Sequence, residues 1–96
     1  MIGKYGMLLI GGGGIGKRWL KALRSVEEIE LLAVADTDVE KARLLAGSYG
    51  KDCQAYVDYQ ECLGRADIDI VLVATPHKYL ASIAKDALSA GKHVIS

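Results

Sequence analysis

Apolar and polar positions follow two different rhythms along the chain, and together they predict alternating strands and helices. Short continuous apolar runs are typical of strands buried on both faces of a parallel sheet. They predict strands at residues 7–10, 31–36, 54–57, 70–74 and 93–95. Between these runs, apolar residues recur every three or four positions, as on one face of a helix. This spacing predicts helices at residues 15–26, 39–49, 58–64 and 76–90, after a lead-in at residues 1–6.

The same periodicity predicts which helical side chains face the core. For the first helix the predicted inward residues are Ile15, Trp19, Leu20, Leu23 and Val26, with Trp19 in the core rather than against a ligand. For the second helix they are Ala42, Leu45, Ala46 and Tyr49. For the last helix they are Leu80, Ile83, Ala84, Ala87 and Leu88. Gly50 and Gly91 stand where glycine commonly ends a helix.

Strands that alternate with helices at this interval predict βαβ units and a parallel sheet. Right-handed crossovers favour a Rossmann-type α/β fold, a doubly wound three-layer αβα sandwich with strand order 3-2-1-4-5. Ligands of such folds bind beyond the carboxyl ends of the strands, at the switch point between the first and fourth strands. Residues 11–16 and 74–77 form the two loops predicted to meet there. The length of 96 residues suits one domain, spanning 1–96.

A glycine run follows the first strand, and it matches G-x-G-x-x-G in one register only, at Gly11, Gly13 and Gly16. In dinucleotide-binding turns the first glycine turns the chain, the second admits the pyrophosphate and the third lets the helix pack closely. The N–H groups at the helix start would then bind the phosphates. A Walker-type loop does not fit, because Lys17 precedes Arg18 instead of a serine or threonine. A flexible turn without a ligand is the alternative.

An acidic residue, Asp36, ends the second predicted strand 20 residues after Gly16. A carboxylate at this place typically accepts hydrogen bonds from the adenosine ribose hydroxyls of a dinucleotide. Its negative charge would repel a 2′-phosphate, and no arginine follows at positions 37 or 38, so the sequence favours NAD over NADP. A helix-capping or solvent-facing role is the alternative, although Asp38 is the better candidate for a cap.

Composition narrows the range of partners. The formal net charge is +0, which provides no electrostatic case for binding nucleic acid or an anionic membrane. No apolar run approaches the ~18 residues that a membrane-spanning helix needs. Cys53 and Cys62 lack the spacing of a C-x-x-C or zinc motif, and they predict reduced thiols in a cytoplasmic protein. No metal site is expected, because His77 and His93 lack carboxylates or thiols at ligating distances along the chain.

Several motifs together resemble the Gfo/Idh/MocA family of glucose–fructose oxidoreductases and inositol dehydrogenases. The matching segments are residues 9–16, 20–23, 32–36, 40–42, 69–76 and 87–94. The last two, with A-T-P and A-L-x-A-G-K-H-V, are the most specific, and the resemblance extends over residues 7–95. It implies a domain that binds NAD or NADP, followed in the family by a larger domain that binds a sugar, polyol or related metabolite.

The resemblance also implies roles for particular residues. The pyrophosphate would face Gly11, Gly13, Gly14, Ile15 and Gly16. The adenosine ribose would be held by Asp36, and the nicotinamide ribose side would lie near Thr75, Pro76 and His77. His77 has two interpretations from the residues alone: a polar lining of the crevice, or an exposed residue in the first turn of a helix.

Two departures from the family pattern bear on catalysis. Leu80 occupies the position where the family usually has a histidine, four residues after the A-T-P proline, and the chain ends at Ser96, just before the family's E-K-P. We therefore expect no catalytic residue in this chain. The hypothesis is a cofactor-binding domain of a hydride-transferring oxidoreductase, without its substrate domain. The alternatives are a stand-alone NAD(H)-binding or sensing module, or a remnant that binds nothing, and the expected partners are a second copy or a chain that supplies a substrate domain.

Overall fold

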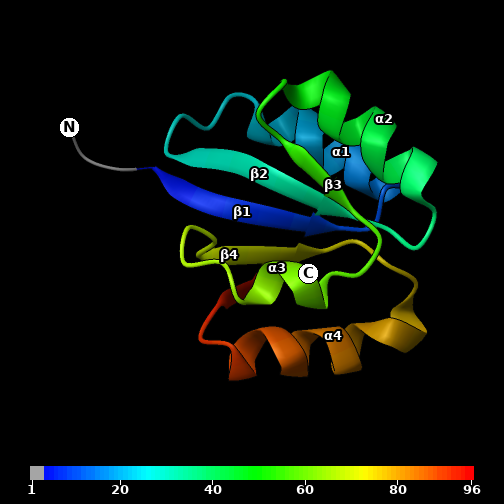
Figure 1. The fold of residues 1–96 in the computed structure, drawn as a ribbon, viewed down its shortest axis with the longest axis vertical. Coiled ribbons are helices and arrows are strands. Elements are labelled where there is room, and N and C mark those ends of the chain that lie inside the picture. Colours follow the sequence, from blue (N-terminus) through cyan, green and yellow to red (C-terminus); the bar gives the residue numbers. More distant parts are fainter. Residues whose placement is uncertain (1–3) are drawn as a thin grey trace.

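Five parallel strands form the centre of the fold (Figure 1). The computed structural model describes residues 4–96. The strands are β1 (Tyr5–Ile10), β2 (Ile29–Ala35), β3 (Gln54–Tyr56), β4 (Ile70–Val73) and β5 (His93–Ile95). Their order across the sheet is β3-β2-β1-β4-β5, which confirms the predicted topology. The helices are α1 (Gly14–Leu23), α2 (Val39–Tyr49), α3 (Gln60–Leu63) and α4 (His77–Ser89).

Two hydrophobic clusters, one on each face of the sheet, hold the layers together. On one face, Leu20 of α1 and Leu45 of α2 pack with Leu9 of β1. On the other face, Ile83 of α4 and Cys62 of α3 pack with alternate residues of β1, β2 and β4. The alternation follows from strand geometry, in which successive side chains point to opposite faces. The sheet therefore separates a layer of α1 and α2 from a layer of α3 and α4.

The strand and helix ends differ from the predictions in several places. β1 begins at Tyr5 rather than at residue 7, because the Tyr5 N–H donates to the Glu28 carbonyl (2.7 Å) and extends the pairing with β2. The apolar pattern did not predict this start, because Tyr5 is exposed and lies outside the apolar run. β2 likewise begins at Ile29, before its apolar run. α3 is shorter than predicted, and α1 ends at Leu23, three residues early.

The predicted inward faces of α1 and α4 were too wide. On α1, Leu20 is buried, whereas Ile15 and Trp19 are 58% and 36% exposed. The prediction of Trp19 as a core residue was therefore wrong, and Val26, beyond the helix end, is also exposed. On α4, Ile83 and Ala87 are buried as predicted, but Leu88 is exposed. The apolar face of a helix can be broad, but a sheet buries only the side chains that lie directly against the sheet.

The predictions for α2 were more accurate. Ala42, Leu45 and Ala46 are buried, and the hydroxyl of Tyr49 accepts a hydrogen bond from the Leu31 N–H (3.3 Å). Gly91, which follows α4, has φ +80, a left-handed conformation that favours glycine. Gly50 follows α2 in an extended conformation (φ 173) that any residue can adopt, so its identity is not required by the turn.

Both cysteines are free thiols, and burial raises the pKa of Cys53 and of Cys62 to about 11. At pH 8 only about one thiol in a thousand would be a thiolate, the form that attacks disulfide reagents. We expect both cysteines of the native protein to react slowly with Ellman's reagent at pH 8, and quickly in guanidinium chloride. Equal rates under the two conditions would contradict the burial of these thiols.

Candidate dinucleotide site

The switch point lies where β1 and β4 run side by side and lead into α1 and α4. The two loops predicted to meet there do so. A Cβ atom added to Gly11 would lie 2.6 Å from the Ala74 carbonyl oxygen, and the Ala74 N–H donates to the Ile10 carbonyl (2.8 Å). The start of α1 and the start of α4 therefore share one edge of the sheet.

The three glycines of the motif meet different local demands. Gly11 has φ +110, a conformation that L side chains rarely adopt, as a sharp turn out of a strand requires. A Cβ on Gly16 would overlap the Gly11 carbonyl oxygen, so this position must be glycine for α1 to pack against the turn. A Cβ on Gly13 would meet no atom within 4 Å. The fold itself requires Gly11 and Gly16, whereas Gly13 leaves open space above the backbone.

Within the described residues, the start of α1 has no side-chain cap and no acidic residue in its first turn. The first N–H groups of a helix have no intrahelical partner, and they carry the positive end of the helix dipole. The start of α4 is uncapped in the same way. By contrast, α2 is capped by Asp38, whose side chain accepts from the Glu40 N–H (3.1 Å). The two helices at the switch point thus keep their N-termini available to an anion, and α2 does not.

Asp36 connects the end of β2 to the glycine loop. Its Oδ2 atom accepts a hydrogen bond from the Gly12 N–H (2.7 Å), and its Oδ1 atom accepts from the Asp38 N–H (2.8 Å). Asp36 is therefore not the cap of α2, in agreement with the assignment of that role to Asp38. Each carboxylate oxygen keeps a further lone pair that can accept a hydrogen bond. The carboxylate lies at the edge of the predicted dinucleotide site. Its role toward a ribose stays a prediction.

Gly12 is a positioning residue that the motif did not reveal, because G-x-G-x-x-G allows any residue at this place. Its N–H orients Asp36, and a Cβ atom on it would lie 3.2 Å from the Lys41 Cβ atom. The loop therefore packs tightly on the first turn of α2. The available signal was the run of four glycines at residues 11–14, of which the motif itself requires only Gly11 and Gly13.

The loop after β4 contributes an unsatisfied polar atom. The hydroxyl oxygen of Thr75 is buried and has no hydrogen-bond partner among residues 4–96. It stands next to the glycine turn, since a Cβ on Gly11 would lie 3.3 Å from the Thr75 nitrogen. Buried hydroxyls are normally paired, so an orphan at a switch point suits a ligand group. Pro76 and His77 are exposed, and His77 is the first residue of α4, directly after this loop.

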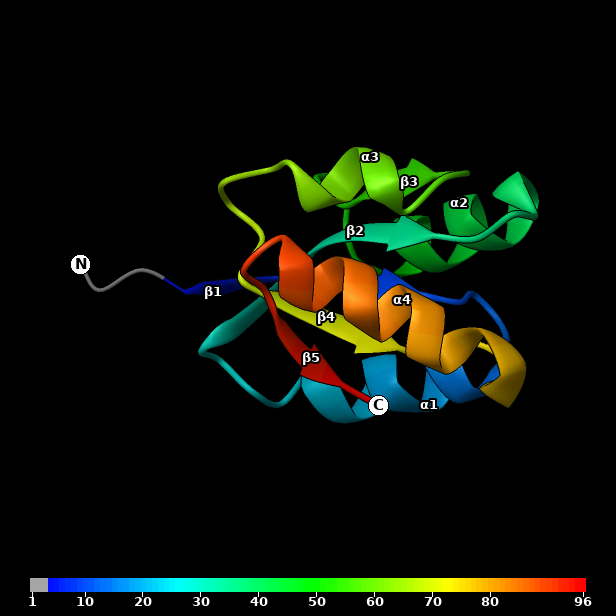
Figure 2. The same ribbon diagram turned by 90° about the horizontal axis from the view of Figure 1, so that it is seen from below.

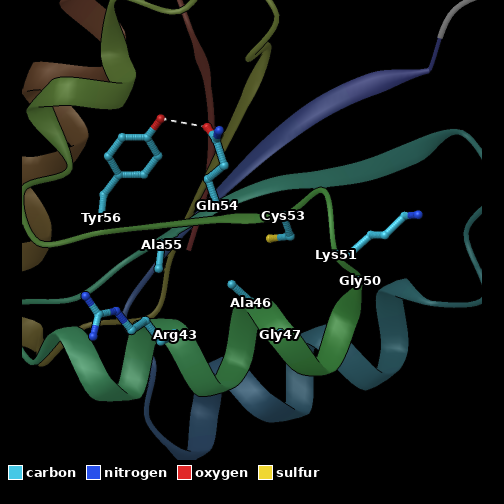
Figure 3. A pocket seen from close by; sticks show the side chains of 9 residues that line it. All are labelled: Arg43, Ala46, Gly47, Gly50, Lys51, Cys53, Gln54, Ala55 and Tyr56. Carbon is cyan, nitrogen blue, oxygen red and sulfur yellow. Dashed lines mark hydrogen bonds between the residues drawn. The ribbon is translucent and has the colours of Figure 1, made fainter.

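Two surface hollows lie away from the switch point. One lies between α2 and β3, where Ala46, Gly47 and Ala55 leave room between helix and strand (Figure 3). The other lies between α1 and α2 and is lined by Lys17, Lys21 and other residues. Neither contains the predicted site residues, which follow the carboxyl ends of β1, β2 and β4. The described part of the chain contains no cluster of potential metal ligands, and none of its helices could span a membrane.

Proteins of known identity resemble this chain in sequence or in structure. The 3-reductase for dTDP-3,4-didehydro-2,6-dideoxy-alpha-D-glucose from Saccharopolyspora spinosa is 40% identical over 83% of this chain and 24% of its own length. The structure of GenD2 from gentamicin A biosynthesis, in complex with NAD, superposes with a TM-score of 0.91 at 28% identity and covers 98% of this chain and 26% of its own. The structure of a mutant of KijD10, a 3-ketoreductase from Actinomadura kijaniata, in complex with TDP-benzene and NADP, superposes with a TM-score of 0.84 at 30% identity. This match covers 95% of this chain and 29% of the KijD10 chain.

This chain corresponds to one part of these longer proteins. The chain spans 21% to 27% of the length of the curated relatives that it matches. The sequence pattern of the Gfo/Idh/MocA group, described as "Oxidoreductase family, NAD-binding Rossmann fold", matches residues 5–96. This match covers nearly the whole chain. The strand order and the glycine turn of the structure agree with it. The chain therefore belongs to the Gfo/Idh/MocA oxidoreductase family, of which it represents the NAD-binding Rossmann domain.

Proposed function

We propose that this chain binds NAD at the crevice between β1 and β4, as the cofactor domain of an oxidoreductase. The reaction would transfer a hydride between the nicotinamide and a hydroxyl-bearing carbon of a sugar, polyol or related metabolite. One observation carries the proposal: the uncapped start of α1 lies beside a carboxylate, Asp36, that is hydrogen-bonded to the glycine loop. Two free thiols are compatible with a reducing, cytoplasmic location.

The residues present suit a dinucleotide. The free N–H groups from Gly13 to Gly16 would bind the pyrophosphate, because Gly13 adds no side chain between them and the ligand. Asp36 would accept hydrogen bonds from the adenosine ribose. The orphan hydroxyl of Thr75, with Pro76 and His77, would face the nicotinamide ribose side. The bound nicotinamide would carry the hydride, and the chain's part would be to hold and orient it.

The choice between NAD and NADP depends on the charge around Asp36. Related structures contain either cofactor, so the family alone does not decide. Here the Gly12 and Asp38 N–H groups hold the carboxylate at the end of β2. A 2′-phosphate at this place would meet a fixed negative charge. It would also replace the ribose hydroxyl from which Asp36 would accept a hydrogen bond. We therefore propose that NAD is preferred.

Calorimetric titration with NADH and NADPH tests this proposal. We expect NADH to bind more tightly than NADPH. Asp36→Ala should weaken NADH binding about tenfold or more, as the loss of a charge-assisted hydrogen bond implies, and should remove the preference. Asp38→Ala is the matched control, because it removes the same charge two residues away. It should leave NADH affinity within about twofold while lowering stability by about 1 kcal/mol through loss of the α2 cap.

Equal affinity of the wild-type chain for both cofactors would contradict the role of Asp36. An equal loss of affinity in both variants would mean that net charge, rather than the position of Asp36, governs binding. Weak binding by the wild type is compatible with the proposal, because this chain spans only 24% of the length of the related reductase from Saccharopolyspora spinosa. Complete absence of binding by a folded wild-type chain would overturn the proposal.

A further inference from the structure

Gly12 occupies a buried position between the glycine turn and the start of α2. In Figure 2 the segments that follow β1 and β2 leave the sheet at the same end, as parallel pairing of these strands requires. Gly11 and Gly91 are the only glycines of residues 4–96 with a positive φ. A left-handed backbone therefore does not explain the glycine at position 12, and the space around this position must be considered instead.

A side chain at position 12 would press on two parts of the site at once. A Cβ atom there would lie 3.2 Å from both the carbonyl carbon and the Cβ atom of Lys41. It would also lie 3.3 Å from the Oδ2 atom of Asp36. The two contacts with Lys41 are shorter than the optimum of roughly 3.5–4.0 Å between carbon atoms. Either the first turn of α2 or the loop that carries position 12 would have to move.

The first turn of α2 is the more firmly held of the two. Asp38 caps this turn, and Ala42, the residue after Lys41, is fully buried. One of the contacted atoms of Lys41 belongs to the backbone, so a change of its side-chain rotamer would not relieve the contact. The displacement would therefore fall on the loop, and it would stretch the hydrogen bond between Gly12 and Asp36.

Within residues 4–96, backbone N–H groups alone hold the Asp36 carboxylate. Its Oδ2 atom accepts from the Gly12 N–H (2.7 Å) and its Oδ1 atom from the Asp38 N–H (2.8 Å), and neither ion pair of these residues includes it. Each bond fixes one oxygen, so loss of the Gly12 bond would leave the carboxylate free to turn about the other. The direction in which Asp36 presents its lone pairs thus depends on position 12.

We propose that the glycine at position 12 determines how strongly this chain distinguishes NAD from NADP, an inference that rests on the proposed cofactor site. The loop N–H holds the carboxylate in place before a cofactor binds, so no binding energy is spent on orienting it. The held carboxylate accepts from a ribose hydroxyl and presents a fixed charge to a 2′-phosphate. With a side chain at position 12 the carboxylate turns aside, so NADH loses a hydrogen bond and NADPH loses a repulsion.

Calorimetric titration of Gly12→Ala with NADH and with NADPH tests this inference. We expect NADH affinity to fall about fivefold or more, as a weakened charge-assisted hydrogen bond implies, and NADPH affinity to change by less than about twofold. Gly14→Ala is the matched control in the same segment, because a Cβ atom there would meet no atom within 4 Å. Its effect falls on the pyrophosphate, which both cofactors share, so the ratio of the two affinities should stay within about twofold of the wild-type ratio.

A double-mutant cycle separates positioning from packing. If Gly12 acts through Asp36, Gly12→Ala should change the affinity ratio by less than about twofold in an Asp36→Ala background, because no carboxylate remains to be held. Asp36→Glu is an independent variant, which decides the outcome if circular dichroism shows that Gly12→Ala is unfolded. It keeps the charge but moves the carboxylate by one methylene group from the Gly12 N–H, so the affinity ratio should fall about fivefold or more.

Three results would overturn the inference. A folded Gly12→Ala protein with the wild-type affinity ratio would show that this glycine serves packing alone. An equal effect of Gly12→Ala with and without the Asp36 carboxylate would show that the two residues act separately. A wild-type ratio in Asp36→Glu would show that a negative charge suffices wherever it is held. Failure of the proposed function is distinguishable from all three, because it appears in the wild type itself as absent binding or as equal affinity for the two cofactors.

Discussion

Replacing Gly6 by alanine is expected to destabilise the protein by about 3 kcal/mol, at the upper end of the range for overpacked sites. A Cβ atom at this place in β1 would overlap the carbonyl oxygen of Asp67. The strand cannot move aside easily. The Gly6 N–H donates to the Asp69 carboxylate (2.9 Å), and its carbonyl accepts from the Asp69 N–H (2.8 Å). Relief would have to displace the segment that carries the buried Ile68.

Thermal unfolding followed by circular dichroism measures this effect. For a domain of this size, about 3 kcal/mol corresponds to a fall in Tm of roughly 15 °C. Gly47→Ala is the control, because a Cβ on Gly47 in α2 would meet no atom within 4 Å. The same substitution there should stabilise the helix by about 1 kcal/mol. If Gly6→Ala melted at the wild-type temperature, β1 would not pack against the Asp67 segment as described.

Gly13→Ala should have the opposite character: little effect on folding and a large effect on cofactor binding. Gly13 has φ −83 and ψ −162, which alanine tolerates, and the added methyl group would touch nothing. We expect a loss of stability of about 1 kcal/mol or less, since alanine is a poorer N-cap than glycine. The methyl group would, however, stand between the helix N-terminus and the pyrophosphate. NADH affinity should fall about tenfold or more, as loss of a charge-assisted contact implies.

Calorimetry with NADH, beside a thermal melt, separates the two effects. Gly50→Ala serves as the control, because it adds a methyl group in similarly open space far from the crevice. It should bind NADH as the wild type does. Unchanged affinity in a folded Gly13→Ala protein would show that the pyrophosphate does not approach this glycine, and the proposed site would be wrong.

The fold was predictable because its signals are local. The apolar runs and the helical periodicity identified nine elements in the correct order, and the right-handed crossover rule then leaves few topologies, of which the predicted strand order is the one that the structure has. The ends of elements were less predictable. Tyr5 joins β1 through a hydrogen bond to Glu28, more than 20 residues away, and no hydrophobic pattern records such a partner. The predicted meeting of the loops at Gly11 and Ala74 was correct, because parallel topology alone requires it.

The sequence by itself determined the strand order, the glycine turn and the position of the acid after β2, because each depends on spacing along the chain. The tertiary structure alone decided how those parts engage. It placed the Asp36 carboxylate on the Gly12 N–H, and it left the Thr75 hydroxyl without a partner. It also decided that Leu20 is buried and Trp19 exposed, although both belong to one apolar arc. Periodicity states which side chains share a helix face, but only the packed sheet and the neighbouring helix determine how much of that face is covered.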